Sequence, residues 1–144
     1  MSTQKAKFAL FAQLAQLGFT YDESAQLRRI ERTLHRWAEQ ECGDGNDYAS
    51  WSIERDEQTG KPFRCVYPHD GKPTRHPIAD REAGALKRAE AIVAARNLRS
   101  SEPQLMIYHQ TDCRGCALYL VKRSDIPAGQ TVESVYTRGF AVCC

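Results

Sequence analysis

The sequence lacks any long apolar run and any strong excess of charge. No apolar run approaches the roughly 20 residues that a helix needs to span a bilayer, so we expect no membrane-spanning helix. The formal net charge of +2 neither demands nor excludes nucleic acid as a partner, and any electrostatic argument must rest on where the charges lie. With 42% apolar and 26% charged residues the composition is that of an ordinary globular protein, which argues against extensive disorder.

Motifs that carry well-known enzyme chemistry are missing too. The chain has no Gly-rich phosphate loop, no His-Glu-x-x-His, no EF-hand pattern and no Gly-x-Ser-x-Gly nucleophile motif. Histidine is scarce, and none of the four histidines lies near a recognisable nucleophile. We therefore expect a protein that is not an enzyme and that needs no cofactor.

The length of 144 residues indicates one domain, 1–144, with a helical part at 1–42 and a mixed part at 48–142. The N-terminal residues contain no small-residue cleavage site, so we expect no signal peptide and a cytoplasmic protein. The six cysteines are then expected to be reduced thiols.

Three stretches have the apolar spacing of amphipathic helices. The first, 5–17, ends at Gly18, where a C′ glycine belongs. The second, 22–42, begins with acidic residues and a cap. Its buried stripe is predicted to contain Leu27, Ile30, Leu34, Trp37 and Ala38. The third, 80–98, is rich in alanine, which predicts close packing against a neighbour, most simply the sheet.

Alternating apolar and polar residues predict strands around these helices. A hairpin is expected at 48–67 with its turn at 56–61, and a second at 104–121 with its turn at 111–115; a last strand is expected at 132–136. Proline and glycine predict an irregular loop at 68–77. The predicted fold class is α+β: an antiparallel sheet of four to five strands, with two N-terminal helices and one central helix packed mainly on one face.

The exposed side of the second helix is basic. Its arginines follow helical spacing, with a single acid, Glu31, among them; they are Arg28, Arg29, Arg32 and Arg36. One interpretation is a cationic surface for phosphates or for an acidic partner. The other is a solvated face that nearby carboxylates partly neutralise.

The turn of the second hairpin holds the one Cys-x-x-Cys in the chain, Cys113 and Cys116, with Asp112 and Arg114 beside them. Two such thiolates can bind tetrahedral zinc, and His109 is a further candidate ligand. No second ligand pair stands at a zinc-finger distance, so ordinary turn cysteines are the competing interpretation. A redox role is disfavoured because the motif lies between two strands and does not open a helix.

Three stretches, 27–43, 78–88 and 108–119, resemble small uncharacterised proteins encoded by phages, prophages and other mobile elements of proteobacteria. The resemblance covers roughly 24–142 and implies no activity for any residue. It implies a setting, the cytoplasm of a bacterial host, in which small phage proteins commonly bind and redirect a host component.

Three hypotheses follow. The first is a non-enzymatic accessory protein that binds a host protein or a protein–nucleic-acid machine, with an anti-CRISPR-like counter-defence role as its most specific form. Its binding surfaces would be the α-helical arginines and the Asp112–Arg114 turn. The second is a direct DNA- or RNA-binding accessory protein, and the third is a small zinc protein that uses Cys113 and Cys116. The sequence leaves the oligomeric state open.

Overall fold

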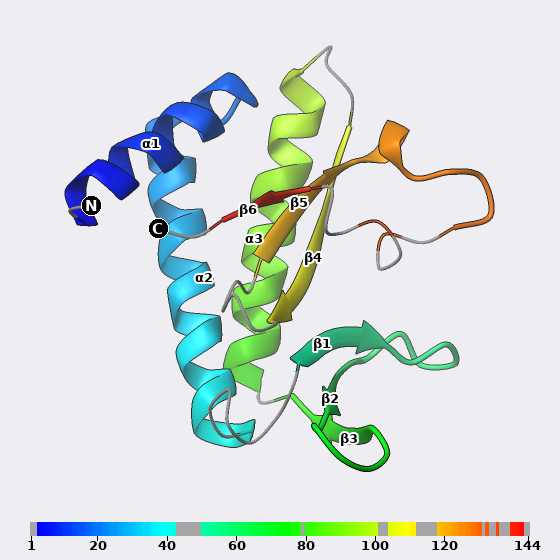
Figure 1. Ribbon diagram of the computed structural model, residues 1–144. Helices are drawn as coiled ribbons and strands as arrows, with labels where there is room; N and C mark the ends of the chain where they lie inside the picture. Colours follow the sequence, from blue (N-terminus) through cyan, green and yellow to red (C-terminus); the bar gives the residue numbers. More distant parts are fainter. Residues whose placement is uncertain are drawn as a thin grey trace.

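The computed structural model describes residues 3–42, 50–78, 80–100, 104–111, 118–130, 132, 135 and 139–142 (Figure 1). These residues form α-helices, β-strands and one short 3₁₀ turn. The helices are α1 (Thr3–Gln16), α2 (Tyr21–Cys42) and α3 (Asp80–Arg99). The strands are β1 (Ser50–Arg55), β2 (Pro62–Tyr67), β3 (Thr74–Pro77), β4 (Leu105–Thr111), β5 (Leu118–Lys122) and β6 (Phe140–Ala141), and the 3₁₀ turn is η1 (Arg123–Asp125). The α+β class is confirmed.

The sheet consists of two antiparallel three-stranded halves, β3-β2-β1 and β4-β5-β6, which meet at β1 and β4. The junction is short. Among the described residues, Trp51 with Thr111 and Ser52 with Gln110 are the positions in register across it, whereas β1 and β2 pair along six positions. The two halves therefore diverge from a narrow seam, as Figure 1 shows where β1 turns away from β4.

The prediction of four to five strands is wrong, because the described residues form six. The extra strand is β3, which lies in the stretch expected to be an irregular loop. Proline is tolerated there because β3 is an edge strand, and Pro77 is its last residue. The strand expected at 132–136 is not seen at Val132 or Val135, and the last strand is β6.

The helix boundaries follow local chemistry. Gly18 has a φ of +98° after α1, which confirms the predicted C′ glycine. α2 begins with a capping box: the Glu23 N–H donates to Thr20 Oγ1 at 3.1 Å, and the Thr20 N–H donates to Glu23 Oε1 at 2.9 Å. The cap is therefore Thr20, one residue before the helix, and not the acidic run that follows it.

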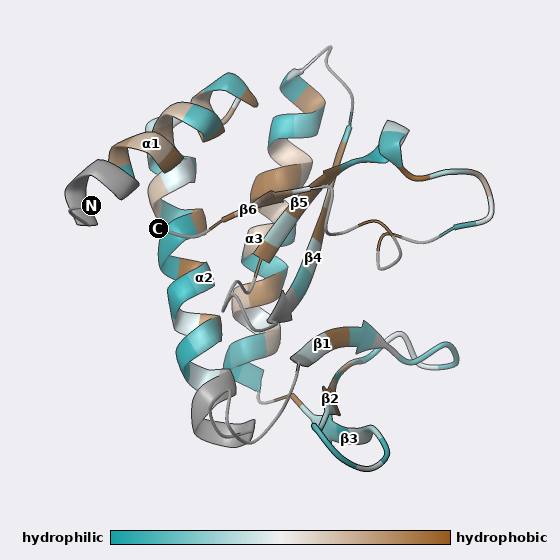
Figure 2. Cartoon of the chain, viewed as in Figure 1, coloured by the Kyte–Doolittle hydropathy of each residue, from teal (hydrophilic) through white to brown (hydrophobic). Residues whose placement is uncertain are grey.

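The helices form successive layers on the sheet. α3 packs against β4, α2 packs against α3, and α1 packs against α2, so the principal helix–sheet contact in the described part of the chain belongs to α3. This differs from the expectation that all three helices lie on the sheet. One apolar core joins the layers, with fully buried Leu14, Leu27, Leu34 and Trp51 among its members. Figure 2 shows the brown, apolar residues gathered on β5 and the inner parts of the helices, while α2 is largely teal.

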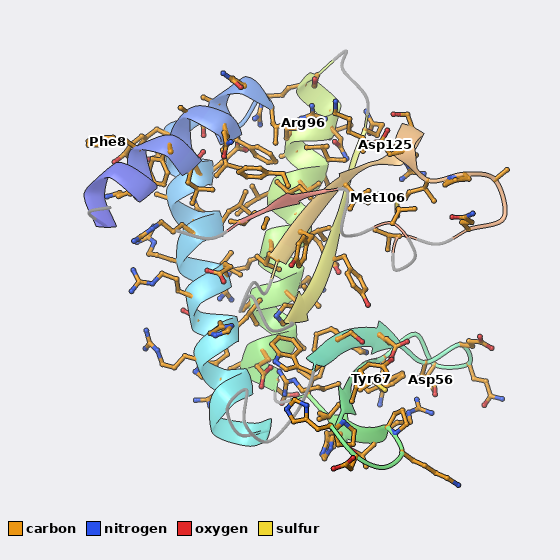
Figure 3. The ribbon with its side chains drawn as sticks, in the orientation of Figure 1. Phe8, Asp56, Tyr67, Arg96, Met106 and Asp125 are labelled. Carbon is orange, nitrogen blue, oxygen red and sulfur yellow. The ribbon has the colours of Figure 1, made fainter. Side chains whose placement is uncertain are left out.

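The C-terminal end of α3 is tied to its neighbours by three polar side chains. Arg96 donates from Nε to the Leu17 carbonyl at 2.6 Å, and Figure 3 shows it pointing toward the α1–α2 connection. Arg99 forms an ion pair with Glu23 at 2.6 Å. Asn97 pairs with both the N–H and the carbonyl of Leu105, each at 3.0 Å. Backbone groups that the helix and strand ends would leave unsatisfied are thus paired.

None of the described helices is long and apolar enough to cross a membrane.

Candidate functional site

The four arginines predicted to bind a partner lie on one side of α2. Because each residue advances an α-helix by about 100°, they fall within an arc of about 100°. We call Arg28, Arg29, Arg32 and Arg36 the α2 arginine face. The opposite side of the helix is held in the core by the buried side chains of Leu27, Ile30 and Leu34. The fold thus presents the arginines on a firmly anchored element.

Three members of the α2 arginine face are exposed, namely Arg29, Arg32 and Arg36, and Arg28 is half-buried. Within the described part of the chain, no carboxylate forms an ion pair with these three exposed guanidinium groups. The acid that lies among them in sequence, Glu31, is itself buried. The exposed arginines therefore keep their charge directed at solvent.

Helix α3 adds two arginines that sequence reasoning missed. Arg88 and Arg29 line the same shallow depression between α2 and α3, with a volume of about 230 Å³. The guanidinium carbon of Arg81 lies 4.4 Å from the ring centre of Trp37 on α2, a cation–π contact. Arg81 and Arg88 are seven residues apart, which places them on one stripe of α3. This spacing is the feature of the sequence that could have indicated them.

A buried polar cluster lies where β1, β2, β4 and α3 meet. Its members are Trp51, Arg64, Glu82 and His109, each at most 2% exposed. Arg64 forms an ion pair with Glu82 and stacks on Trp51, with its guanidinium carbon 4.9 Å from the ring centre. The Trp51 and His109 rings meet edge to face at 4.6 Å. The ion pair bridges β2 and α3 inside the core.

His109, named above as a further candidate zinc ligand, is therefore buried in the core. Burial, and then the nearby charges of Arg64 and His35, hold the pKa of His109 well below its ordinary value. The imidazole is neutral at pH 7, with one nitrogen as donor and one as acceptor.

The described residues provide no support for the hypothesis of a zinc site. No group of three or more His, Cys, Asp or Glu side chains among them could hold a metal ion. Asp112, Cys113, Arg114 and Cys116 lie outside the described residues. The flanking strands β4 and β5 do pair as the predicted hairpin, so zinc binding at the turn stays a prediction.

Another polar group occupies the opposite face of β1 and β2. Alternation along the strand places Cys65 and Tyr67 on the side away from Arg64. Burial raises the pKa of the Cys65 thiol. A hydrogen bond with Cys65, burial and the charge of Glu54 raise the pKa of Tyr67 to about 12. Both groups are therefore protonated at neutral pH, and neither is an activated nucleophile.

No protein-family model, no curated protein and no solved structure matches this chain.

Proposed function

We propose that this protein is a non-enzymatic accessory protein that binds an acidic surface of a host protein, or of a protein–nucleic-acid machine, through the α2 arginine face. The observation that carries the proposal is the set of three exposed arginines, without carboxylate partners among the described residues, on a helix fixed in the core. The resemblance to phage and mobile-element proteins supports a bacterial host as the setting. Counter-defence of the anti-CRISPR kind is the most specific form of this proposal.

The charge pattern of α2 favours a binding surface over an ordinary solvated face. The exposed residues Arg32 and Arg36 are four positions apart, so each is the helical neighbour of another cation. Like-charge pairs at this spacing destabilise a helix by about 0.2–0.5 kcal/mol each, whereas solvated faces usually alternate charges of opposite sign. An acidic partner would offset this repulsion between neighbouring guanidinium groups, so the charge pattern favours binding to such a partner.

The test is partner capture from a proteobacterial host lysate with tagged protein. The test variant is Arg32→Glu with Arg36→Glu. The control is Lys61→Glu with Lys72→Glu, which changes the charge by the same amount at exposed positions in the turns beside β2. Because arginine anchors at an interface each contribute about 2 kcal/mol or more, we expect the test variant to weaken capture by at least about 30-fold. Equal capture by both variants would refute the role of α2.

Direct binding of DNA or RNA is the second candidate, favoured by Arg88 beside Arg29, which widens the basic surface from one helix to two. Three phosphate contacts predict a log–log slope of affinity against salt of about −2.7, or a loss of about 40-fold between 50 and 200 mM salt. Fluorescence anisotropy with mixed-sequence single- and double-stranded oligonucleotides measures this slope. Arg32→Ala should make the slope shallower by about 0.9.

Nuclease treatment of half the lysate separates the two candidates. A host protein captured equally from both halves supports the protein-directed function. Capture that requires intact nucleic acid, together with a salt slope near the expected value, makes nucleic acid the ligand.

A further inference from the structure

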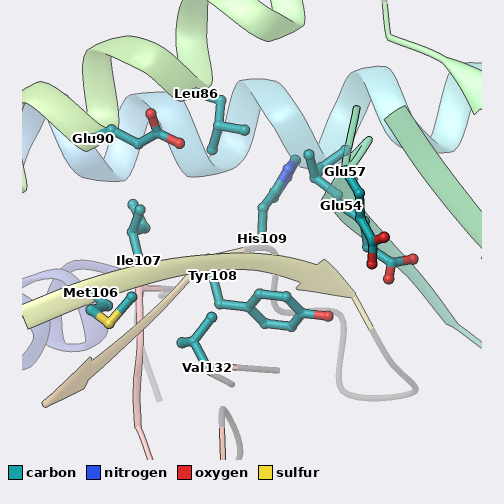
Figure 4. A pocket seen from close by; sticks show the side chains of 10 residues that line it. Glu54, Glu57, Leu86, Glu90, Met106, Ile107, Tyr108, His109 and Val132 are labelled. Atoms are coloured by element: carbon teal, nitrogen blue, oxygen red, sulfur yellow. The ribbon is translucent and has the colours of Figure 1, made fainter. Parts of the chain in front are cut away.

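A cleft of about 590 Å³ opens where the two halves of the sheet diverge. β1 contributes Ile53 to it, and β4 and α3 contribute Ile107 and Leu86, which Figure 4 labels. Apolar side chains from three elements thus form its walls. A volume of 300–1,000 Å³ with mainly apolar walls is typical of sites for small organic molecules.

The seam of the sheet explains why the cleft exists. Within the described part of the chain, β1 and β4 are in register at two positions, Trp51 with Thr111 and Ser52 with Gln110. Ile53 is the next residue of β1, and it lines the cleft together with His109 of β4. The opening therefore begins where the strand pairing ends, and it is part of the backbone arrangement.

The charged residues that line the cleft are all acidic. Glu54 comes from β1, Glu57 from the β1–β2 turn and Glu90 from α3, and no lysine or arginine is among the described lining residues. These carboxylates do not converge on a metal position, since the described residues contain no group able to hold a metal ion. The charge suits an organic cation whose apolar part rests on the walls.

The second observation is His109, which lines the cleft from its buried side. The residue is 2% exposed, and neither ring nitrogen has a hydrogen-bond partner within the described part of the chain. Figure 4 shows the ring directed from β4 toward the helices, between Leu86 and the β1 side of the cleft. A buried polar side chain normally has a partner, so a ligand that supplies one would complete the site.

We propose that this cleft binds a small organic cation, namely an amine with a flat apolar body and a hydrogen-bonding group at the far end. The ammonium lies beside the Glu54 and Glu57 carboxylates, which Figure 4 shows next to each other, the apolar body lies between Ile53 and Ile107, and the far group pairs with the His109 imidazole. This site is independent of the α2 arginine face.

Three matched probes test the proposal. Tryptamine has the ammonium, the flat body and an N–H at the far side; indole-3-propionate has the same ring with a negative charge; 2-(1-naphthyl)ethylamine keeps the ammonium and lacks the N–H. Binding is followed by amide chemical shifts in ¹⁵N spectra of the full chain. We expect tryptamine to bind with a Kd of about 1 mM or lower, with shifts centred on Ile107 and His109. The naphthyl amine should bind more weakly and the propionate not measurably.

Comparing variants inside and outside the cleft with the same change of charge tests whether tryptamine binds in the cleft. Glu54→Gln with Glu57→Gln should weaken tryptamine binding at least tenfold, and Glu57→Gln alone, with a smaller loss of affinity, serves if the pair fails to fold. Asp70→Asn with Asp125→Asn removes the same charge at exposed positions outside the cleft lining and should leave binding unchanged. Equal binding of tryptamine and indole-3-propionate, or shifts confined to other surfaces, would overturn the proposal. So would cleft shifts produced only by a basic peptide such as trilysine.

Discussion

The burial of His109 predicts how the stability of the protein depends on pH. In the unfolded chain a histidine has a pKa of about 6.5, whereas in the folded protein burial, Arg64 and His35 keep the pKa of His109 well below that value. The unfolded state therefore takes up a proton on acidification that the folded state does not. The contribution of His109 to stability is complete above about pH 6.5 and is lost as the pH falls toward the folded-state pKa.

The size of the effect follows from proton linkage. Between pH 7.5 and pH 5.5 the unfolded state gains about 1.4 kcal/mol from protonating one histidine of pKa 6.5, if the folded state remains unprotonated. His109→Phe removes the titrating group while keeping a flat ring of similar size against Trp51. The loss of stability between these two pH values should thus be smaller in the variant by about 1.4 kcal/mol.

Urea unfolding followed by tryptophan fluorescence at both pH values provides the measurement. The comparison is between the pH-induced changes in unfolding free energy, so that titration of the other groups cancels. Val93→Ala is the control, because it weakens the core without removing a titrating group and should preserve the wild-type pH dependence. If His109→Phe keeps the full wild-type pH dependence, the neutral buried state of His109 is refuted.

Three further predictions concern stability and are tested by the same urea unfolding assay. Glu82→Gln should cost about 3–5 kcal/mol, because it leaves the guanidinium of Arg64 buried without its counter-charge. Asn97→Ala should cost about 2 kcal/mol through loss of both hydrogen bonds to the Leu105 backbone. Asn97→Asp should cost less, because the carboxylate can still accept the hydrogen bond that the Leu105 N–H donates. Gly139→Ala should cost about 1–3 kcal/mol, since its Cβ would lie 2.5 Å from a backbone carbonyl oxygen of β5; an unchanged stability would show that the β5–β6 contact shifts easily.

Features set by local chemistry could be predicted from the sequence. The helices follow from apolar spacing, and Gly18 marks the end of α1 because only a residue that tolerates positive φ fits there. The β1–β2 turn is likewise local: Asp56 accepts hydrogen bonds from the N–H groups of Gln58 and Thr59, and Gly60 has a φ of +71°.

Features set by long-range packing could not be predicted. β3 was missed because proline and glycine indicate a loop, and only its place at the sheet edge makes the strand possible. At 132–136 the alternation of apolar residues resembles a strand, yet Val132 packs on the Tyr108–Tyr119 pair from outside the sheet. The pairing of Arg64 with Glu82 joins residues that are 18 positions apart, and no local pattern indicates it.

The candidate functional surfaces also combine features that the local sequence predicts with features that depend on tertiary packing. The α2 arginine face follows from helical spacing alone, but its exposure and its extension by Arg88 depend on how α3 lies beside α2. The acidic cleft is the opposite case. Its carboxylates come from a strand, a turn and a helix, and they line one cleft only because β1 diverges from β4.

The short seam between the two halves of the sheet also bears on the order in which the chain assembles. β1, β2 and β3 pair through short turns, so their contacts close small loops and form early. The seam instead pairs Trp51 with Thr111, so forming it closes a long loop of chain. The entropic cost of closing that loop is offset by few strand hydrogen bonds. Its formation therefore comes late in folding, and its opening breaks few strand hydrogen bonds while the β1–β2 and β4–β5 pairs remain. Because the cleft begins at this seam, transient separation of β1 from β4 can widen the entrance of the cleft while the β1–β2 and β4–β5 hairpins stay paired.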